Sequence, residues 1–150
     1  MDELDSAIVR HLQEDARQSN RDIARKVGIA PSTCLERIRL LRARGVIRGY
    51  HADIDLPSLN RGVQALVAVQ IRPLSRAVID SFQLLADLPE VLSVYVTAGN
   101  DDLLIHVTAQ DIDHLHGFLA DRLATRKGVV GLRTSIIYRH VHNTVLEPLP

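Results

Sequence analysis

The chain has 150 residues, of which 46% are apolar and 24% charged, and its 18 Lys and Arg balance 18 Asp and Glu. This composition is typical of a folded protein and excludes a disordered one, while the length allows one domain or two small ones. A single cysteine excludes a framework of internal disulfides, the first residues lack the pattern of a secretory signal, and no apolar run approaches the roughly 20 residues of a membrane span. These features predict a cytoplasmic protein with no membrane partner.

Helical patterns open the chain. Apolar residues recur at helical spacing over residues 3–15, and Asp2 is placed to cap this helix. Ser19 and Asp22 resemble a capping box, which predicts that a second, short helix begins there. Gly28 suits the turn that follows, because glycine adopts a positive φ without strain.

A third helix is predicted from Pro31, which suits a first helical turn, to Gly45, which suits a helix end. Its inward face is set by Cys34, Ile38 and Leu41. Three helices, of which the last two are joined by a short turn, predict a helix-turn-helix. In that motif the second helix of the pair enters the major groove of DNA.

Positive charge is concentrated on this motif. Residues 17–48 carry nine Lys and Arg against two acids, a net charge of +7 in a neutral chain. A solvated helix surface would explain a charge run alone, but together with the motif the charge favours DNA binding. Four outward side chains of the third helix are placed to read base edges, namely Ser32, Thr33, Glu36 and Arg39. The other basic residues are expected to hold phosphates, namely Arg21, Arg25, Lys26, Arg37, Arg42 and Arg44.

After Gly45 the residue pattern is no longer helical, and a second module follows. Residues 46–55 are typical of a strand or β-ribbon, as in a winged helix-turn-helix, and residues 56–62 of a linker. The patterns beyond them predict a ferredoxin-like β-α-β-β-α-β sandwich, with strands at 63–71, 91–98, 102–109 and 129–141 and helices at 75–88 and 111–126. The predicted fold class is α+β, with a helix-turn-helix domain at 1–49, a β-ribbon or linker at 50–62 and a ferredoxin-like domain at 63–150.

The predicted sheet is apolar on both faces. Both helices of a ferredoxin-like fold pack on one face, yet Leu66, Ala68 and Leu104 put apolar side chains on the other. Such a face needs a second cover, and self-association supplies one. A dimer also suits a helix-turn-helix protein, because it reads the two half-sites of a pseudo-palindromic operator.

The turn between the second and third strands is a candidate ligand site. Gly99 and Asn100 are explained by a tight turn, but Asp101 and Asp102 place two like charges side by side, which brings no stability. A plain turn is the alternative.

The chain resembles the Lrp/AsnC family of transcriptional regulators over essentially its whole length. The features that match are individually weak but specific in their joint order, namely Leu4-Asp5, Leu12-Gln13, Ala24, Val27-Gly28, Cys34-Leu35-Glu36-Arg37 and Gly45-Val46-Ile47-x-Gly49-Tyr50. The resemblance implies sheet-to-sheet dimers that assemble further, commonly into octamers as tetramers of dimers. It also implies a cytoplasmic, nucleoid-associated regulator of transcription.

The resemblance further implies an effector pocket between subunits. The family's Gly-x-x-Asp motif falls on Gly99 and Asp102, and residues of the last strand that couple ligand to response fall on Ser135, Ile136 and Ile137. A carboxylate there could pair with the ammonium of an amino acid, and the hydroxyls of Thr134 and Ser135 could hold its carboxylate. The predicted effector site comprises Gly99, Asn100, Asp101, Asp102, Thr134, Ser135 and Ile136. Asp101 stands where many members have an aromatic residue.

Other functions find little support in the residues. No nucleophile, phosphate-loop or zinc-protease motif is present, so we expect no enzyme and no cofactor apart from the effector. His114 with His116, and His140 with His142, lack metal-ligand spacing, so no metal site is expected. Two rivals stay open, which are a metabolite-binding module that controls an enzyme by contact and an architectural DNA-binding protein without an effector.

Overall fold

The computed structural model describes residues 1–149, which form two compact units. One comprises Met1–Asp53 together with the C-terminal residues from Val141, and the other comprises Ile54–His140. The sequence assigned residues 63–150 to one domain, so the grouping of the C-terminal segment with the first unit differs from that expectation, and residue 150 lies outside the described residues. No helix within the described part of the chain is long and apolar enough to span a membrane.

The first unit contains three helices, α1 (Glu3–Glu14), α2 (Asn20–Val27) and α3 (Pro31–Ala43). The predicted caps are present. Asp2 accepts a hydrogen bond from the N–H of Asp5 at 2.7 Å, and Ser19 accepts one from the N–H of Asp22 at 3.1 Å. Gly28 ends α2 with φ +73°, a conformation that a residue with a Cβ adopts only with strain.

A small core holds these helices together. It consists of the buried residues Ile8, Ile23, Ala24, Cys34 and Leu41, so the predicted inward face of α3 is confirmed. Burial raises the pKa of the Cys34 thiol, which keeps it protonated and makes it a packing group.

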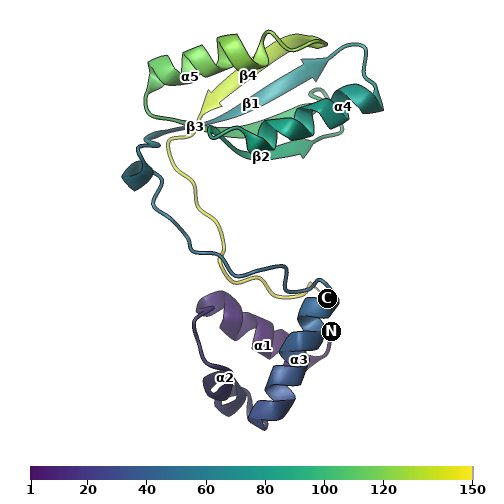
Figure 1. Cartoon of the computed structure of the whole chain (residues 1–150), viewed down its shortest axis with the longest axis vertical. Coiled ribbons are helices and arrows are strands. Elements are labelled where there is room, and N and C mark those ends of the chain that lie inside the picture. Colours follow the sequence, from purple (N-terminus) through teal and green to yellow (C-terminus); the bar gives the residue numbers. More distant parts are fainter. Residues whose placement is uncertain (150) are drawn as a thin grey trace. The chain divides into compact units, whose positions relative to one another are not determined.

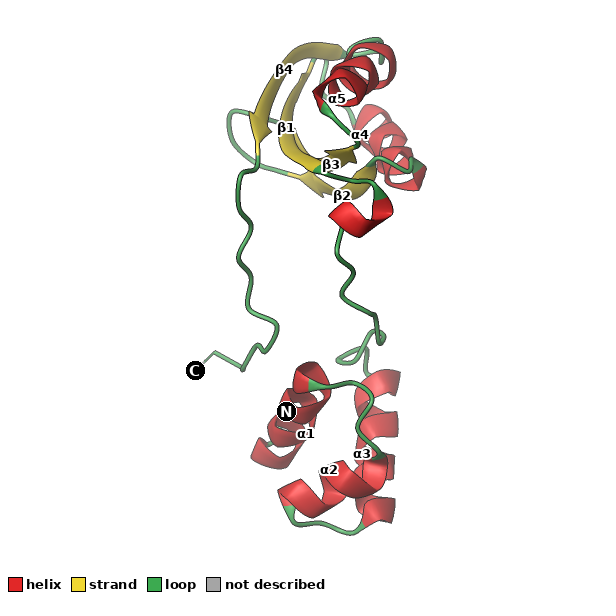
Figure 2. Cartoon of the chain, turned by 90° about the vertical axis from the view of Figure 1, so that its left-hand side faces the viewer, coloured by secondary structure: helices red, strands yellow, loops and turns green. Residues whose placement is uncertain are grey.

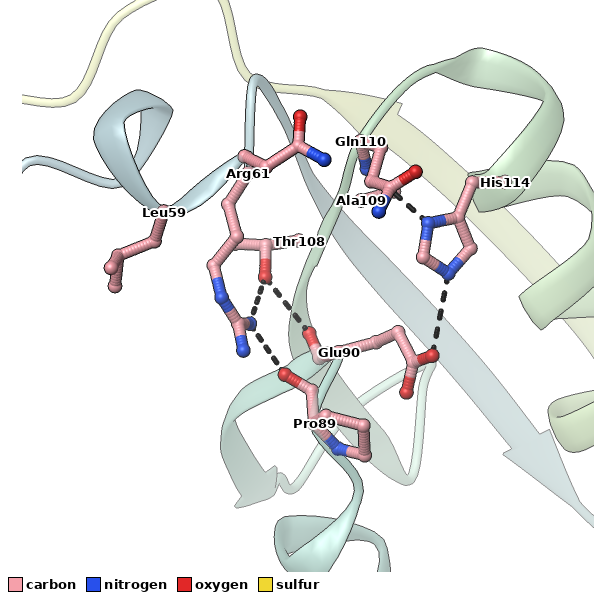
Figure 3. Close-up of a pocket in the computed structure, with 9 residues that line it drawn as sticks. Leu59, Arg61, Pro89, Glu90, Thr108, Ala109, Gln110 and His114 are labelled. Carbon is pink, nitrogen blue, oxygen red and sulfur yellow. Dashed lines mark hydrogen bonds and ion pairs between the residues drawn. The ribbon is translucent and has the colours of Figure 1, made fainter.

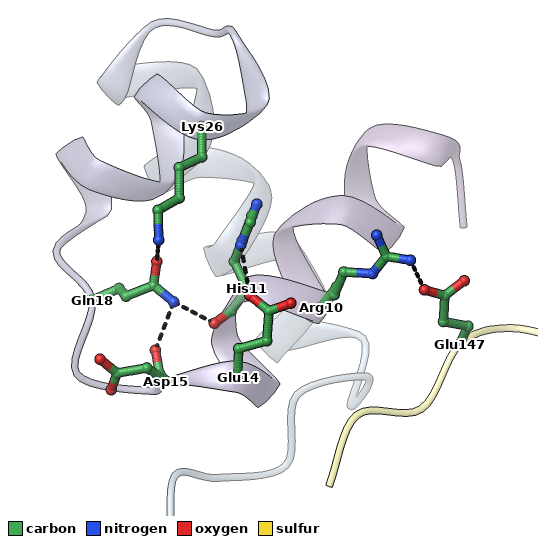
Figure 4. Close-up of polar contacts among 7 residues, drawn as sticks. All are labelled: Arg10, His11, Glu14, Asp15, Gln18, Lys26 and Glu147. Carbon is green, nitrogen blue, oxygen red and sulfur yellow. Dashed lines mark hydrogen bonds and ion pairs between the residues drawn. The ribbon is translucent and has the colours of Figure 1, made fainter. Parts of the chain in front are cut away.

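The C-terminal segment is bonded to α1. The side-chain amide of Gln13 donates to the carbonyl oxygen of Leu146 at 2.9 Å and accepts from the N–H of Leu146 at 2.8 Å. Arg10 forms an ion pair with Glu147 (Figure 4). One glutamine thus pairs with both backbone groups of a residue, as a neighbouring strand would.

The second unit is a four-stranded antiparallel sheet with helices on one face (Figures 1 and 2). The strand order is β2-β3-β1-β4, and the succession of elements is the β-α-β-β-α-β of the ferredoxin-like fold predicted from the sequence. The strands are β1 (Val63–Ile71), β2 (Val91–Val96), β3 (Leu103–Ala109) and β4 (Val129–Ile136), and the helices are α4 (Arg76–Gln83) and α5 (Ile112–Phe118).

The core of this unit lies between the sheet and the helices. Alternate residues of β1 and β3, such as Val67 and Ile105, are fully buried against helix residues such as Phe82. The intervening residues Leu66 and Leu104 point to the other face and are half-buried. The two-sided apolar pattern predicted for the sheet is therefore present.

Four predicted elements differ from those observed. Residues 46–55 form no strand within the described chain, since no segment pairs with them and a strand depends on a neighbour's hydrogen bonds. The last strand ends at Ile136, not at residue 141, and the N–H of Ile137 makes one more bond to β1, to the carbonyl oxygen of Gln64 at 2.9 Å. Both long helices change geometry, since α4 continues as a 3₁₀ turn (Leu84–Asp87) and α5 as a π-helical turn (Leu119–Leu123).

Candidate functional sites

The outward face of α3 is exposed as its amphipathic pattern predicts. Because Cys34 and Leu41 are buried, the residues on the opposite side of the helix face solvent. The side chains of Glu36 and Arg39 are 61% and 69% exposed, and the atoms Oε2 and Nη1 that face each other are 3.9 Å apart. Ser32 and Thr33 are exposed in the first turn. The four predicted base-reading residues therefore share one accessible surface.

The first turn of α3 also has unpaired backbone donors. Its N-cap is Ala30, whose side chain makes no capping bond, so the first N–H groups of the helix have no side-chain acceptor. Asn20 fixes the position of this turn by donating to the carbonyl oxygen of Pro31 at 2.7 Å. An exposed helix start of this kind favours a negatively charged partner such as a phosphate.

Arg37 does not lie free on this surface, although the sequence placed it among the phosphate contacts. Its Nη1 donates to Asp2 and to Asp5, each at 2.7 Å, and its side chain is 30% exposed. Asp5 is buried at 7% exposure and also faces Arg44 at 3.7 Å. Arg37 therefore joins α3 to α1. The only sequence signal for this link was an acid on the otherwise apolar inner side of α1.

The remaining basic residues differ in how strongly they are held. Three have an intramolecular partner, namely Arg25 with Asp22, Lys26 with Gln18 and Arg44 with Asp5. Figure 4 shows Gln18 between Lys26 and the carbonyl oxygens at the end of α1. Arg21 and Arg42 are exposed and make no side-chain bond within residues 1–149.

The turn between β2 and β3 is tied to the sheet through Asp102. This carboxylate accepts a hydrogen bond from the N–H of Ile71 at 2.7 Å and pairs with Arg72 at 3.1 Å, and its side chain is 12% exposed. Gly99 lies in the turn with φ +145°, where glycine is favoured. Asp102 thus serves the fold, because without it the Ile71 N–H would lose its acceptor.

Asp101 pairs with a different arginine, which belongs to β4. Its carboxylate pairs with Arg133 of β4 at 2.6 Å, and the Arg133 side chain is 69% exposed. The two adjacent acids are therefore each neutralised by their own arginine, which the sequence analysis missed. Arg72 and Arg133 are distant from the turn in the chain, and only the strand order brings them to it.

The predicted effector residues fall into two groups within the chain. Gly99, Asn100, Asp101 and Asp102 lie at one end of β1, beside Ile71. Thr134, Ser135 and Ile136 lie opposite Val67, Leu66 and Ala65. The turn also contacts β1 at Val69, whose carbonyl oxygen accepts the N–H of Asp102 at 3.0 Å, and Val69 is two residues, or roughly 7 Å of extended strand, from the partner of Thr134. Within one chain the turn therefore lies near Thr134, since Asp101 pairs with the preceding residue Arg133, whereas Ser135 and Ile136 lie farther along β4.

The described residues contain no cluster of three or more His, Cys, Asp or Glu side chains that could hold a metal ion.

Two family models match the chain. The AsnC-type helix-turn-helix domain matches residues 1–42, and the Lrp/AsnC ligand binding domain matches residues 64–146. The two matches divide the chain between the helical motif and the sheet unit.

Individual relatives match over nearly the full length. The HTH-type transcriptional regulator AldR of Mycolicibacterium smegmatis is 40% identical over 142 residues, which is 94% of this chain and 83% of that protein. The transcriptional regulator AzlB of Bacillus subtilis is 35% identical and covers 99% of this chain and 96% of its own length. The crystal structure of a transcriptional regulator of Neisseria meningitidis in complex with L-Met has a TM-score of 0.89 at 32% identity, covering 97% of this chain and 96% of that one.

Proposed function

Because this chain belongs to the Lrp/AsnC family of HTH-type transcriptional regulators, we propose that its first unit binds a pseudo-palindromic operator and its second unit senses an amino acid or a related metabolite. The observation that carries the DNA-binding part is the outward face of α3. There Ser32, Thr33, Glu36 and Arg39 are exposed together beside a helix start with unpaired donors. Such a regulator acts in the cytoplasm, on DNA of the nucleoid.

The basic residues divide by role in this proposal. Arg39 and Glu36 lie on the outward face and read bases, since Arg pairs well with guanine and Glu with cytosine. Arg21 and Arg42 hold phosphates, as do Arg25, Lys26 and Arg44 once they exchange their weak intramolecular partners for DNA. Arg37 holds α3 to α1 through Asp2 and Asp5 and makes no base contact.

An electrophoretic shift on the protein's own promoter region, at two salt concentrations, tests this division. Arg39→Ala should relax base preference, whereas Arg44→Ala should weaken binding to all sequences alike and reduce its salt dependence. Arg76→Ala, an exposed arginine at the start of α4, is the control and should bind as the wild type does. Binding that ignores salt, or identical effects of the first two changes, would contradict the proposal.

The open face of the sheet is the proposed dimer surface. Leu66, Ala68 and Leu104 line it, and Tyr95 of β2 pairs with Leu104. His106 lies on the same face, and burial, followed by the charge of His140, lowers the pKa of its ring. A neutral ring at pH 7 is compatible with an apolar interface. The two-fold axis of such a dimer matches a pseudo-palindromic operator, and further assembly gives an octamer, a tetramer of dimers.

The effector part of the proposal centres on Asp101 and Arg133. A surface ion pair is readily exchanged, and this one offers an anion for an ammonium and a cation for a carboxylate. An amino acid carries both groups, and the Neisseria relative is a complex with L-Met. The turn itself is shaped by Gly99, Asn100 and Asp102. In a pocket between subunits, the second subunit supplies Thr134, Ser135 and Ile136.

A thermal-shift screen with the twenty amino acids tests the effector. At least one should raise the melting temperature of the wild type, and Asp101→Asn should abolish the shift, because binding to the folded state stabilises it. Operator binding with no response to any amino acid, checked by calorimetric titration, would instead favour the architectural protein without an effector.

A further inference from the structure

A cavity of about 190 Å³ lies in the second unit, away from the turn between β2 and β3. It opens between the segment that precedes β1, the residues before β2, the end of β3 and the first turn of α5 (Figure 3). The polar groups that line it are Asn60, Arg61, Glu90, Thr108, Gln110 and His114. Neither the predicted effector site nor the DNA interface uses these residues.

Arg61 supplies an oriented cation on one side of this cavity. Its Nη1 donates to the hydroxyl of Thr108 at 2.7 Å and to the carbonyl oxygen of Pro89. Thr108 is buried at 1% exposure and in turn donates to the carbonyl oxygen of Glu90 at 3.3 Å. The bonds of Nη1 thus fix the guanidinium of Arg61. The Nε and Nη2 of Arg61 make no bond within residues 1–149 and remain available as donors.

Glu90 supplies an anion on the other side. Its Oε1 faces Nε2 of His114 at 3.3 Å, and Nδ1 of the same ring accepts the N–H of Gln110 at 3.4 Å. A neutral ring that accepts at Nδ1 carries its proton on Nε2, so His114 donates to Glu90. The second carboxylate oxygen, Oε2, has no partner in the described chain. Figure 3 shows the guanidinium of Arg61 across the cavity from the Glu90–His114 pair.

Amide groups complete the lining. The side chains of Asn60 and Gln110 make no hydrogen bond within the described residues, and each offers both donors and an acceptor. A ligand would therefore meet a cation, an anion and neutral amides within one small space. The volume is below the roughly 300–1,000 Å³ of sites for drug-sized molecules, which limits the ligand to a few heavy atoms.

We infer that this cavity is a second ligand site for a small α-amino acid, held with its carboxylate on Arg61 and its ammonium on Oε2 of Glu90. The amides of Asn60 and Gln110 hydrogen bond to the carboxylate. The cavity accepts side chains of the size of glycine, alanine or serine. This site goes beyond the turn of the proposed function and shares with it only the class of ligand.

Such a ligand would act on the segment that enters the sheet. Asn60 and Arg61 follow the 3₁₀ turn Pro57–Leu59 and directly precede β1. A ligand that engages the remaining donors of Arg61 tightens this segment against β3, where Thr108 lies. If the ligand binds more tightly when this segment is held against β3 than when it is detached, the ligand shifts the protein toward the state in which the segment is held.

Calorimetric titration of the full chain with glycine, L-alanine and L-serine tests the site. At least one should bind, and L-alanine should bind at least tenfold more tightly than propionate, which lacks only the ammonium. Glu90→Gln keeps the shape of the side chain, and it should remove this preference. Failure of all three amino acids to bind, or a preference over propionate that survives Glu90→Gln in a protein with unchanged melting temperature, would overturn the inference.

Hydrogen exchange of the same samples locates the ligand. Protection should appear at residues 57–62, 88–92 and 106–116, and it should persist in Asp101→Asn, which alters the turn and its pair with Arg133 but no residue of the cavity. Protection confined to residues 97–102 and lost in Asp101→Asn would refute this second site while leaving the proposed effector turn intact. Protection at the cavity alone would support the second site and contradict the turn.

Discussion

Two arginines in α3, two residues apart, have different surroundings. Arg37 lies between Asp2 and Asp5, whereas Arg39 extends into solvent with only a distant acid, Glu36. Helical periodicity located Arg39 correctly on the outward face, because that depends on the angle per residue alone. It could not assign Arg37, because the acids that bind it come from another helix.

Replacing Arg37 by Ala should destabilise the first unit. The change leaves the buried carboxylate of Asp5 with only Arg44, at 3.7 Å, as a cationic neighbour. We expect the melting temperature, followed by circular dichroism, to fall by roughly 5 °C or more. Arg39→Ala, which removes an exposed side chain of the same type, should leave it nearly unchanged. Equal effects of the two changes would mean that the contact with Asp5 contributes nothing.

Asp2 gives the first unit a dependence on acid pH. The N–H of Asp5, and then Arg37, hold the pKa of the Asp2 carboxyl below its ordinary value of 3.8. A lowered pKa in the folded state means that the stabilisation is present above about pH 4 and is lost as the pH falls through the folded value. Asn caps helices as well as Asp but carries no charge. The melting temperature of Asp2→Asn should therefore lie below that of the wild type at pH 6 and approach it at pH 3. A difference that is the same at both pH values would contradict this assignment.

At the scale of elements, local signals were reliable and long-range ones were not. Caps and glycine turns followed from a few neighbouring residues, such as Ser19 with Asp22 and Gly28. The strand expected at residues 46–55 failed because its pattern says nothing about a partner. In the turn after β2, the sequence singled out Asp101 and Asp102 as adjacent like charges, but it could not show the arginines that pair with them, which come from other parts of the sheet. Likewise the cavity lined by Arg61 and Glu90 has no signature in the sequence, since separate elements supply its residues.

The turn after β2 should depend on the acceptor that Asp102 provides. Asp102→Ala leaves the N–H of Ile71 without its bond at the end of a buried strand and should cost about 1–3 kcal/mol of unfolding free energy. Asp102→Asn keeps an acceptor oxygen and loses only the pair with exposed Arg72, so it should cost less than about 1 kcal/mol. Urea denaturation measures both. If the Asn variant is as unstable as the Ala variant, the charge of Asp102 matters more than its hydrogen bond.

At the scale of the whole molecule, the sheet unit has one face covered by its own helices and one that is not. The apolar side chains on the open face were evident from alternation along the strands, which reports both faces of a sheet. The alternation does not predict how many subunits assemble on this face. The proposed dimer therefore depends on the side chains themselves, in particular Leu66 and Leu104.

A charge on the open face should prevent the proposed dimer. Leu104→Glu puts a carboxylate between Ala68 and Tyr95, where a paired sheet would have to desolvate it. We expect sedimentation velocity to show monomers of this variant and larger assemblies of the wild type. Leu84→Glu changes a leucine that is 64% exposed in the 3₁₀ turn after α4, and it should assemble normally. Assembly of Leu104→Glu as in the wild type would exclude this face as the interface.

The bonds between Gln13 and Leu146 have a consequence for the order in which the chain folds during synthesis. Helices α1 to α3 leave the ribosome first, but the residues that α1 binds follow the entire sheet unit. At about 5–20 residues per second, several seconds pass before Leu146 is made. The three helices must persist without it during that time. The unit at the start of the chain is therefore completed only after the second unit has been synthesised.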